Sequence, residues 1–222
     1  MNKITDKYTE TFNTWNKVAN LYEDKFMNLD LYNTTYDIFC NLIETEKPNI
    51  LELGCGPGNI TKYLISKKPD FNILGLDVSP NMIELANKNN PTANFEVMDV
   101  RFIEKIERKF DAIVCGFIIP YLSKKDRKEL IENCAKLLTE KGILYLSFVE
   151  GKYEHSKYQT GSNGSRMFFY YHELNKIKSE LIENDFQILN NEDVEYKKQN
   201  GIEIHTVLIA KQNKRKHNRV DG

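Results

Sequence analysis

Residues Ile50–Leu64 read ILELGCGPGNITKYL, an apolar run, a glycine-rich turn and an amphipathic stretch. These patterns predict a strand over Asn49–Leu53 and a helix over Ile60–Lys67. The glycines at positions 54, 56 and 58 lack a Cβ, so the backbone of the turn can approach a ligand closely and adopt positive φ. A turn of this kind, at the carboxyl end of a strand, lies where open α/β sheets bind their ligands.

The spacing of the glycines separates three classes of cofactor site. A P-loop ends in Gly-Lys-Ser/Thr, whereas Gly58 is followed by Asn59-Ile60-Thr61. A dinucleotide fingerprint would place its third glycine where Asn59 stands. Glu52 precedes the turn, where a carboxylate would repel a pyrophosphate but could accept a hydrogen bond from an ammonium group, directly or through water. The turn therefore favours a zwitterionic, sulfonium-bearing ligand over a diphosphate.

Two more carboxylates follow the next two strands. Asp77 ends the strand predicted over Asn72–Leu76, where it can accept hydrogen bonds from both hydroxyls of a ribose. Asp99 follows the strand predicted over Asn94–Met98 and could accept an adenine amino proton, while the Val100 N–H meets a ring nitrogen. The alternative is that Asp77 only caps the next helix and that Asp99 is an ordinary loop residue.

The remaining pattern predicts an α/β fold with seven strands. Further helices are expected over 81–88, 126–138 and 171–184, and further strands over 110–115, 143–149, 186–196 and 202–210. Alternating strands and helices indicate parallel βαβ units covered on both faces. The last two strands are joined by Lys197–Gly201, whose Asn200-Gly201 pair is a hairpin signal, so the parallel sheet should end in an antiparallel hairpin.

The first 46 residues are expected to be helical. One helix face carries apolar residues at spacings of three and four, namely Phe12, Trp15, Val18, Ala19 and Tyr22. A second helix is expected over 31–46, closed by Pro48.

Composition limits the class of protein. The 222 residues suit one domain, and a net charge of −1 gives no electrostatic reason to expect a nucleic-acid partner. No apolar run approaches the roughly 18 residues of a spanning helix, the N-terminus is too polar for a secretory signal, and the four cysteines form no Cys-x-x-Cys pair. We therefore expect a cytoplasmic monomer or homodimer, with neither membrane nor metal, and a polar tail over 212–222.

The chain resembles the class I S-adenosylmethionine-dependent methyltransferases from about Tyr8 to Lys211. Glu52–Gly58 is similar to the first motif of that family, and Asp77 and Asp99 to its ribose-binding and adenine-binding acids. The stretch 110–121 is similar to its fourth-strand motif, and 137–148 to the helix, turn and strand that follow, with Glu140-Lys141-Gly142 in place of Pro-Gly-Gly. The resemblance implies a Rossmann-like three-layer sandwich with strand order 3-2-1-4-5-7-6, strand 7 being antiparallel.

The resemblance also implies a cofactor and a division of the chain. The cofactor would be S-adenosyl-L-methionine and the product S-adenosyl-L-homocysteine. Within the family the chain looks like small-molecule methyltransferases with an N-terminal helical lid, here 1–46, on a core of 47–211. The implied cofactor-binding residues are Tyr22, Glu52, Gly54, Cys55, Gly56, Asn59, Asp77, Val78, Met82, Asp99, Val100, Cys115, Gly116 and Phe117.

The fourth-strand segment, CGFIIPYL, bears on the acceptor. Relatives that methylate amino groups of bases or glutamine usually carry Asn/Asp-Pro-Pro-Tyr/Phe there, whereas this chain has Phe117-Ile118-Ile119-Pro120-Tyr121. Methylation of nucleic-acid bases is therefore disfavoured. Phe117, Ile118 and Tyr121 would form the wall of an apolar pocket.

The segment 150–171 is rich in Tyr, His and turn residues and is predicted to cover the substrate. Its candidates for substrate contact or proton removal, together with the residue that follows it, are Glu150, His155, Arg166, Tyr170, Tyr171 and His172. Of these, His155, His172 and Tyr171 are the candidate catalytic residues, and Arg166 and Tyr170, with Tyr121, the candidate substrate contacts. The alternative is a surface β-hairpin that turns at Ser162–Gly164 and packs its aromatic side chains on the sheet.

The sequence thus predicts methyl transfer to a small O, N, C or S acceptor. A non-catalytic cofactor-binding sensor or partner subunit is the alternative, and an NAD-dependent oxidoreductase a third reading. An open pocket near Phe117 would favour the enzyme, and a pocket filled by Met167–Tyr171 the binding protein.

Overall fold

The structure, a computed structural model, describes residues 6–161, 164–198 and 201–213. The helices are α1 (Lys7–Lys17), α2 (Ala19–Phe26), α3 (Asn33–Leu42), α4 (Asn59–Lys67), α5 (Pro80–Asn89), α6 (Lys124–Leu137) and α7 (Leu174–Glu183), with short 3₁₀ turns at Val100–Lys105, Ile119–Tyr121 and Tyr153–His155. The strands are β1 (Asn49–Leu53), β2 (Asn72–Asp77), β3 (Asn94–Val97), β4 (Phe110–Gly116), β5 (Leu138–Val149), β6 (Lys157–Thr160), β7 (Arg166–Phe169), β8 (Phe186–Lys198) and β9 (Gly201–Gln212).

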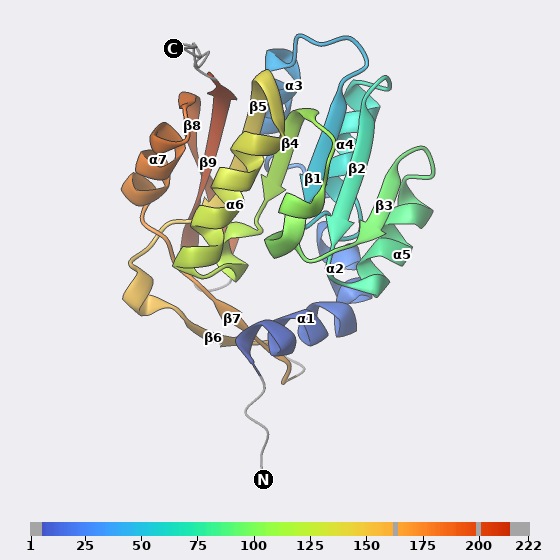
Figure 1. Cartoon of the computed structure of the whole chain (residues 1–222). Helices are drawn as coiled ribbons and strands as arrows, with labels where there is room; N and C mark the ends of the chain where they lie inside the picture. The colour runs from blue at the N-terminus through green and yellow to red at the C-terminus, as the bar shows by residue number, and fades with distance from the viewer. Residues whose placement is uncertain (1–5, 162–163, 199–200, 214–222) are drawn as a thin grey trace.

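The central sheet has the order β3-β2-β1-β4-β5-β9-β8 (Figure 1). Strands β1 to β5 pair in parallel, and β9 is antiparallel to both β5 and β8. Because β6 and β7 form a separate pair, β8 and β9 are the sixth and seventh strands of the large sheet. The predicted α/β fold, with order 3-2-1-4-5-7-6 and an antiparallel seventh strand, is confirmed.

The sheet separates two apolar clusters, which makes the three layers. On one face, Leu51 and Leu53 belong to the cluster that includes Ile131 of α6 and Leu181 of α7. On the other face, Ile50 packs with the cluster that includes side chains of α3 and α4. β1 is buried on both faces because its side chains alternate between these clusters. Each fully buried Leu or Ile contributes about 1.5–3 kcal/mol to the free energy of unfolding.

The N-terminal helix prediction is wrong in one respect. The apolar face over 12–22 belongs to two helices, because Val18 leaves helical geometry at φ −100°, ψ 12° and lies between α1 and α2. The second predicted helix is also shorter than expected, since Ile43 is extended and ends α3.

Two boundaries in the second half of the chain also shift. β5 begins at Leu138 instead of Ile143, because Leu138 pairs with Phe110 ahead of a bulge. α7 begins at Leu174, so the residues at 171 and 172 precede the helix. Asn200 of the predicted hairpin turn and residues 214–222 of the predicted tail lie outside the described residues.

The β6–β7 hairpin and α1, which are far apart in the sequence, meet below the carboxyl ends of the parallel strands (Figure 1). In the segment predicted to cover the substrate, β6 pairs with β7, as the hairpin alternative expected; Ser162 and Asn163 of its turn are not described. The N–H of Phe168 in β7 donates to Thr11 Oγ1 in α1 at 3.0 Å, and Thr14 Oγ1 donates to the Arg166 carbonyl at 2.7 Å. These bonds join the hairpin to α1.

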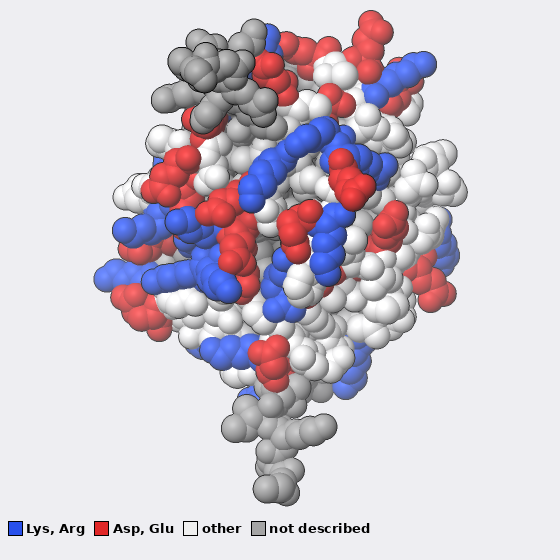
Figure 2. Space-filling model, in the orientation of Figure 1, with Lys and Arg blue, Asp and Glu red and all other residues white. Residues whose placement is uncertain are grey.

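Charge is mixed on the face that carries α6, where Lys and Arg lie among Asp and Glu (Figure 2). One ion pair in this region is largely buried: Arg127 of α6 contacts Glu180 of α7. None of the helices in the described part of the chain is both long and apolar enough to cross a membrane.

Candidate functional site

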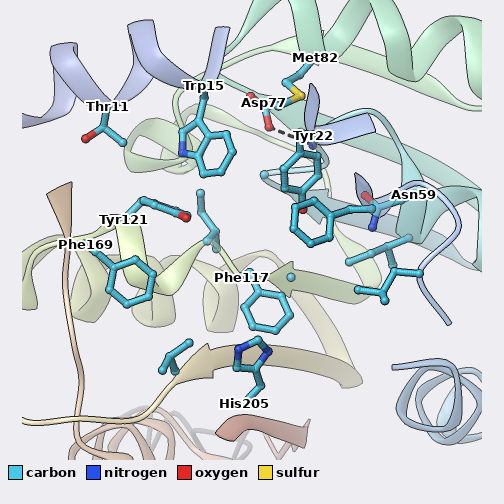
Figure 3. A pocket seen from close by; sticks show the side chains of 18 of the residues that line it. Thr11, Trp15, Tyr22, Asn59, Asp77, Met82, Phe117, Tyr121, Phe169 and His205 are labelled. Carbon is cyan, nitrogen blue, oxygen red and sulfur yellow. Dashed lines mark hydrogen bonds between the residues drawn. The ribbon is translucent and has the colours of Figure 1, made fainter. Parts of the chain in front are cut away.

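A cavity of about 320 Å³ lies at the carboxyl edge of the sheet, between the strand ends and the N-terminal helices (Figure 3). Its wall combines three parts of the chain: the helices α1 and α2, the strand ends near the glycine turn, and the end of β8 with the start of β9. Aromatic side chains dominate this wall, namely Phe12, Trp15, Tyr22, Phe26, Tyr32, Tyr36, Phe117, Tyr121, Phe169 and Tyr196.

The glycine turn forms the floor of one end. Gly56 has φ +53°, and a Cβ added there would lie 3.6 Å from the Tyr22 ring, inside the cavity. Gly58 begins α4 at φ +80°, and a Cβ there would lie 2.3 Å from Asn90 Nδ2. The first glycine keeps the cavity floor bare, and the second is required by packing.

Asp77 joins the glycine turn to the end of β2. Its Oδ2 accepts from the Gly56 N–H at 3.0 Å, and its Oδ1 accepts from the Ser79 N–H at 2.9 Å. Burial raises the pKa of this carboxyl, and the backbone hydrogen bonds oppose that rise. Asp77 lines the cavity, and each of its oxygens keeps a lone pair after these contacts. It can therefore accept two further hydrogen bonds from a ligand.

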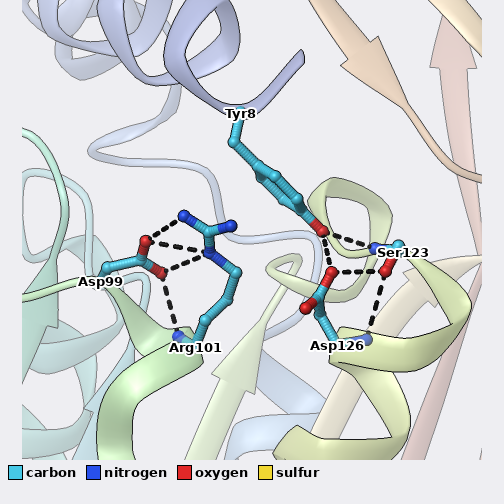
Figure 4. Close-up of polar contacts among 5 residues, drawn as sticks. All are labelled: Tyr8, Asp99, Arg101, Ser123 and Asp126. Carbon is cyan, nitrogen blue, oxygen red and sulfur yellow. Dashed lines mark hydrogen bonds and ion pairs between the residues drawn. The ribbon is translucent and has the colours of Figure 1, made fainter. Parts of the chain in front are cut away.

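Asp99 also lines the cavity, beside Val100, but its carboxylate already has a cationic partner (Figure 4). The Arg101 guanidinium donates to both carboxylate oxygens, with Nε to Oδ2 at 2.9 Å, and lies 3.9 Å from the centroid of the Tyr8 ring. The Tyr8 hydroxyl contacts Asp126, at the start of α6. This network ties α1 to the strand ends on that side of the cavity.

Glu52 lies beneath the cavity and does not line it. The side chain is 1% exposed, Thr61 Oγ1 donates to its Oε2, and its Oε1 has no hydrogen-bond partner. Burial raises the pKa of Glu52 to about 8, against the opposing effect of Thr61. A buried carboxyl oxygen without a partner is costly, which marks a place where a donor from a ligand or a water molecule would be stabilising.

Among the other predicted cofactor contacts, most line the cavity and two do not. Tyr22, Gly54, Gly56, Asn59, Val78, Met82, Gly116 and Phe117 lie in its wall, with Asp77, Asp99 and Val100. Cys55 and Cys115 are buried outside that wall, and both are free cysteines.

Aromatic side chains from α1, the fourth-strand segment and β7 close the other side of the cavity (Figure 3). Trp15 packs edge-on against both Tyr22 and Tyr121, with ring centroids 5.5 and 5.3 Å apart. Tyr121 in turn packs edge-on against Phe169 of β7 at 5.9 Å. The predicted wall residues at 117, 118 and 121 all line the cavity.

Asn16 fastens α1 to the helix that follows Asp77. Its Oδ1 accepts from Ser79 Oγ at 2.9 Å and from the Asn81 N–H at 3.0 Å. We expect Asn16→Ala to open α1 and to weaken ligand binding about tenfold, because the helix loses a contact of about 1 kcal/mol or more. Hydrogen exchange of residues 7–26 should quicken in this variant. Asn13→Ala, at an exposed position of the same helix, should change neither quantity.

The far end of the cavity contains polar groups that sequence reasoning missed. His205 and Glu203 of β9, with Tyr196 and Lys198 of β8, line the wall near Phe117. Side chains alternate along a strand, so the sequence could have shown that residues 203 and 205 share one face of β9. That signal could not show that this face meets the glycine turn.

Phe117 lies at the junction of the two ends. It has φ +55°, which is uncommon for a bulky residue, and its N–H donates to Ser147 Oγ at 3.0 Å. Such backbone strain persists where the surrounding structure holds it and is concentrated at functional sites.

The candidates in and beside the cover segment do not line the cavity. His155 is exposed, and Tyr171, which follows β7, packs against Phe169 with ring centroids 5.1 Å apart. His172 is buried, with its Nδ1 2.7 Å from Arg127 Nη1 and its Nε2 3.0 Å from the Leu122 carbonyl. Burial and the neighbouring Arg127 lower the pKa of His172 to about 4. The cavity wall therefore contains none of these three candidates.

The remaining three candidates make contacts with α1, the Ile119–Tyr121 turn and α7. Arg166 is paired with Glu10 of α1. Tyr170 is buried, and its N–H donates to the Pro120 carbonyl at 2.7 Å. Glu150 Oε1 accepts from the Leu174 N–H at 3.2 Å at the start of α7.

Comparison with known proteins finds similarity to methyltransferases in part of the chain. Residues 50–142 match the family described as methyltransferase domain. Demethylmenaquinone methyltransferase from Thermotoga maritima is 31% identical over 105 residues, which are 47% of this chain and 45% of that protein. The chain spans about half the length of the first curated relatives that it matches.

Solved structures share the fold over nearly the whole chain. Magnesium protoporphyrin IX methyltransferase from Synechocystis PCC 6803, with bound SAM, matches with a TM-score of 0.70 at 16% identity. The match covers 96% of this chain and 100% of that one. The 1,6-didemethyltoxoflavin-N1-methyltransferase from Burkholderia thailandensis, with bound 1,6-didemethyltoxoflavin and S-adenosylhomocysteine, has a TM-score of 0.71 at 12% identity, with coverages of 96% and 93%.

Proposed function

We propose that the chain is a class I S-adenosylmethionine-dependent methyltransferase that transfers a methyl group to a small-molecule acceptor bound in the cavity, since its residues 50–142 match a methyltransferase domain. The observation that carries the proposal is the continuity of that cavity. One space runs from Asp77 and the glycine turn to the aromatic wall around Phe117. A cofactor at the first end and an acceptor at the second would therefore meet inside the protein.

The cofactor is S-adenosylmethionine, in keeping with the family match, and it supplies an electrophilic methyl group on a sulfonium. The described residues fit it at two points. The bare floor at Gly56 leaves room for backbone contact, and the unpartnered Glu52 Oε1 suits an ammonium group, through a water molecule because Glu52 lies beneath the wall. Asp77 would accept from the ribose hydroxyls, and Asp99 and Val100 would hold the adenine.

The aromatic wall would do most of the catalytic work by positioning. Holding an acceptor atom in line with the methyl carbon and sulfur can supply roughly 7–11 kcal/mol of barrier reduction. The rings of Trp15, Tyr121 and Phe169 pack edge to face and restrict the acceptor's orientation. Exclusion of water by these rings strengthens electrostatic interactions inside the cavity.

We also propose that the N-terminal helices act as a lid and that the segment 150–171 supports it. The bonds of Thr11 and Thr14 to β7, and of Asn16 to Ser79, join both segments across the cavity. Opening α1 would expose the cofactor end to solvent.

A second candidate, a protein that binds the cofactor without catalysis, has less support. That alternative expected residues 167–171 to fill the acceptor pocket. Of these, Phe169 lines the cavity wall, and the space beside Phe117 extends to His205. This open space favours the enzyme.

Calorimetric titration with S-adenosylhomocysteine tests the proposal first. We expect micromolar binding, followed by methyl transfer from labelled S-adenosylmethionine to members of a panel of small aromatic and aliphatic acceptors. Binding without transfer to any acceptor would favour the sensor or partner subunit. Tight NADH binding without S-adenosylhomocysteine binding would establish the oxidoreductase instead.

A further inference from the structure

A buried histidine at the acceptor end of the cavity is held at both ring nitrogens. His205 is 6% exposed. Its Nδ1 lies 2.5 Å from the Tyr32 hydroxyl, and its Nε2 lies 2.9 Å from Glu203 Oε1. Glu203 also forms an ion pair with Lys198. A histidine placed only for packing would not require two polar partners and a line of charged groups behind it.

The partners define which nitrogen can take a proton. Burial raises the pKa of Tyr32, so its hydroxyl is neutral and donates to Nδ1. The Nε2–H therefore donates to Glu203, whose pKa is lowered by its hydrogen bonds from Lys198 and His205 in spite of burial. Burial lowers the pKa of His205, against the opposing effect of Glu203, so the imidazole is neutral. Its Nδ1 is a base that already receives a hydrogen bond from a hydroxyl in the cavity wall.

The orientation of the ring is fixed from several elements. Tyr196 of β8 stacks on His205 with centroids 5.0 Å apart and planes at 14°, and Phe117 packs edge-on at 4.9 Å. The planes of the Tyr32 ring and the imidazole are 8° from parallel, with centroids 6.0 Å apart. The titratable groups around His205 are thus Tyr32 before α3, Tyr196 and Lys198 of β8, and Glu203 of β9.

Tyr32 lines the cavity, and its oxygen keeps acceptor capacity. It donates its one proton to His205, and its lone pairs can accept a hydrogen bond from a ligand. The surrounding wall is made of aromatic rings, which pack best against another planar ring. A planar ring that carries a hydroxyl would fill this space with the ring and donate a hydrogen bond to Tyr32 with the hydroxyl.

We propose that Tyr32 and His205, oriented by Glu203, form a proton relay for an acceptor of the phenol class. This inference rests on the proposed methyl transfer. The acceptor O–H bond breaks and its proton moves to the Tyr32 oxygen, while the Tyr32 proton moves to His205 Nδ1. The acceptor oxygen uses the freed electron pair to bond the methyl carbon, and the electrons of the carbon–sulfur bond remain on sulfur. The positive charge lost by sulfur appears on the imidazolium, beside the Glu203 carboxylate.

Three variants test the relay: His205→Asn, whose amide can accept from Tyr32 but is no base, Tyr32→Phe, and Glu203→Gln. Matched controls are Glu195→Gln, at an exposed position of β8, and Tyr63→Phe, whose hydroxyl donates to Asp37 outside the cavity. The probe is 4-nitrophenol, whose neutral and ionised forms absorb differently. Its absorption when bound reports ionisation without any turnover, and labelled S-adenosylmethionine reports transfer.

We expect bound 4-nitrophenol to be more ionised on the wild-type protein than in buffer at the same pH, and to lose that shift in His205→Asn and Tyr32→Phe. Methyl transfer to the phenol should fall about 10²–10⁴-fold in kcat for His205→Asn. Glu203→Gln should shift the pH profile of kcat/KM. Both control variants should behave as wild type.

The relay is overturned if 4-nitrophenol fails to bind, or if its ionisation and transfer are the same in His205→Asn and Tyr32→Phe as in wild type. Binding of S-adenosylhomocysteine separates the two proposals. Retained binding with an inert relay refutes only the relay, whereas no binding by the folded wild-type protein refutes the proposed function itself. In that second case, the absorption of bound 4-nitrophenol still tests whether Tyr32 and His205 take up a proton from a phenol.

Discussion

Asp77→Ala is expected to weaken S-adenosylhomocysteine binding about 10²–10⁴-fold, because two hydrogen bonds between a carboxylate and ribose hydroxyls are worth about 1.5–3 kcal/mol each. The same carboxylate accepts from the Gly56 N–H at 3.0 Å, so the substitution also loosens the turn on which the ligand rests. Calorimetric titration measures the loss. Asp70→Ala, at an exposed position of the same charge, should bind as wild type.

Asp77→Asn separates the two roles of this side chain. The amide keeps one oxygen that can accept from Gly56, but it loses the charge and one acceptor atom. We expect it to retain the thermal midpoint of the wild type more closely than Asp77→Ala does and still to bind less tightly. If Asp77→Ala binds S-adenosylhomocysteine normally, the carboxylate serves only its own turn, and the cofactor lies elsewhere in the cavity.

Glu52→Gln is expected to raise the free energy of unfolding at pH 8 by roughly 3 kcal/mol more than at pH 5 in the ligand-free protein. The Glu52 pKa is about 8 in the folded protein and near 4.5 as its ordinary value. The folded state therefore holds the proton more tightly than the unfolded chain. The stability that this group contributes is complete below pH 4.5 and is lost as the pH rises through 8. Glutamine does not titrate and escapes that loss.

Urea unfolding at the two pH values measures this difference. Glu84→Gln, at an exposed position of α5, should show none of it. Equal effects of Glu52→Gln at pH 5 and pH 8 would mean that the carboxyl is ionised in the folded protein at both. Bound S-adenosylhomocysteine should lower the pKa of Glu52, since an ammonium group near the carboxyl favours its ionised form. Binding at pH 7 should then release a proton, which calorimetry in two buffers detects.

The sheet was predictable because its signal is local. β1 was expected over Asn49–Leu53 and is found there, since a central strand buried on both faces appears as a continuous apolar run. The N-terminal helices were predicted less well. The apolar face over 12–22 continues across Val18, but the chain turns there so that α1 and α2 can both lie over the strand ends. Periodicity reports which side chains are buried and not where a helix bends.

By itself, the sequence determined the alternation of strands and helices, the hairpin of the last two strands and the place of the glycine turn, because each depends on residues close together in the chain. The order of the strands in the sheet followed from the family resemblance. The approach of Asp77 to Gly56 also follows from that local order, since consecutive parallel strands end at one edge. Only the tertiary structure brought Glu203 and His205 to Tyr32, more than 170 positions away, and left His172 beside Arg127 instead of in the cavity. The physical reason is that a hydrogen bond between distant segments depends on how the strands and the N-terminal helices pack together, which a pattern of neighbouring residues does not encode.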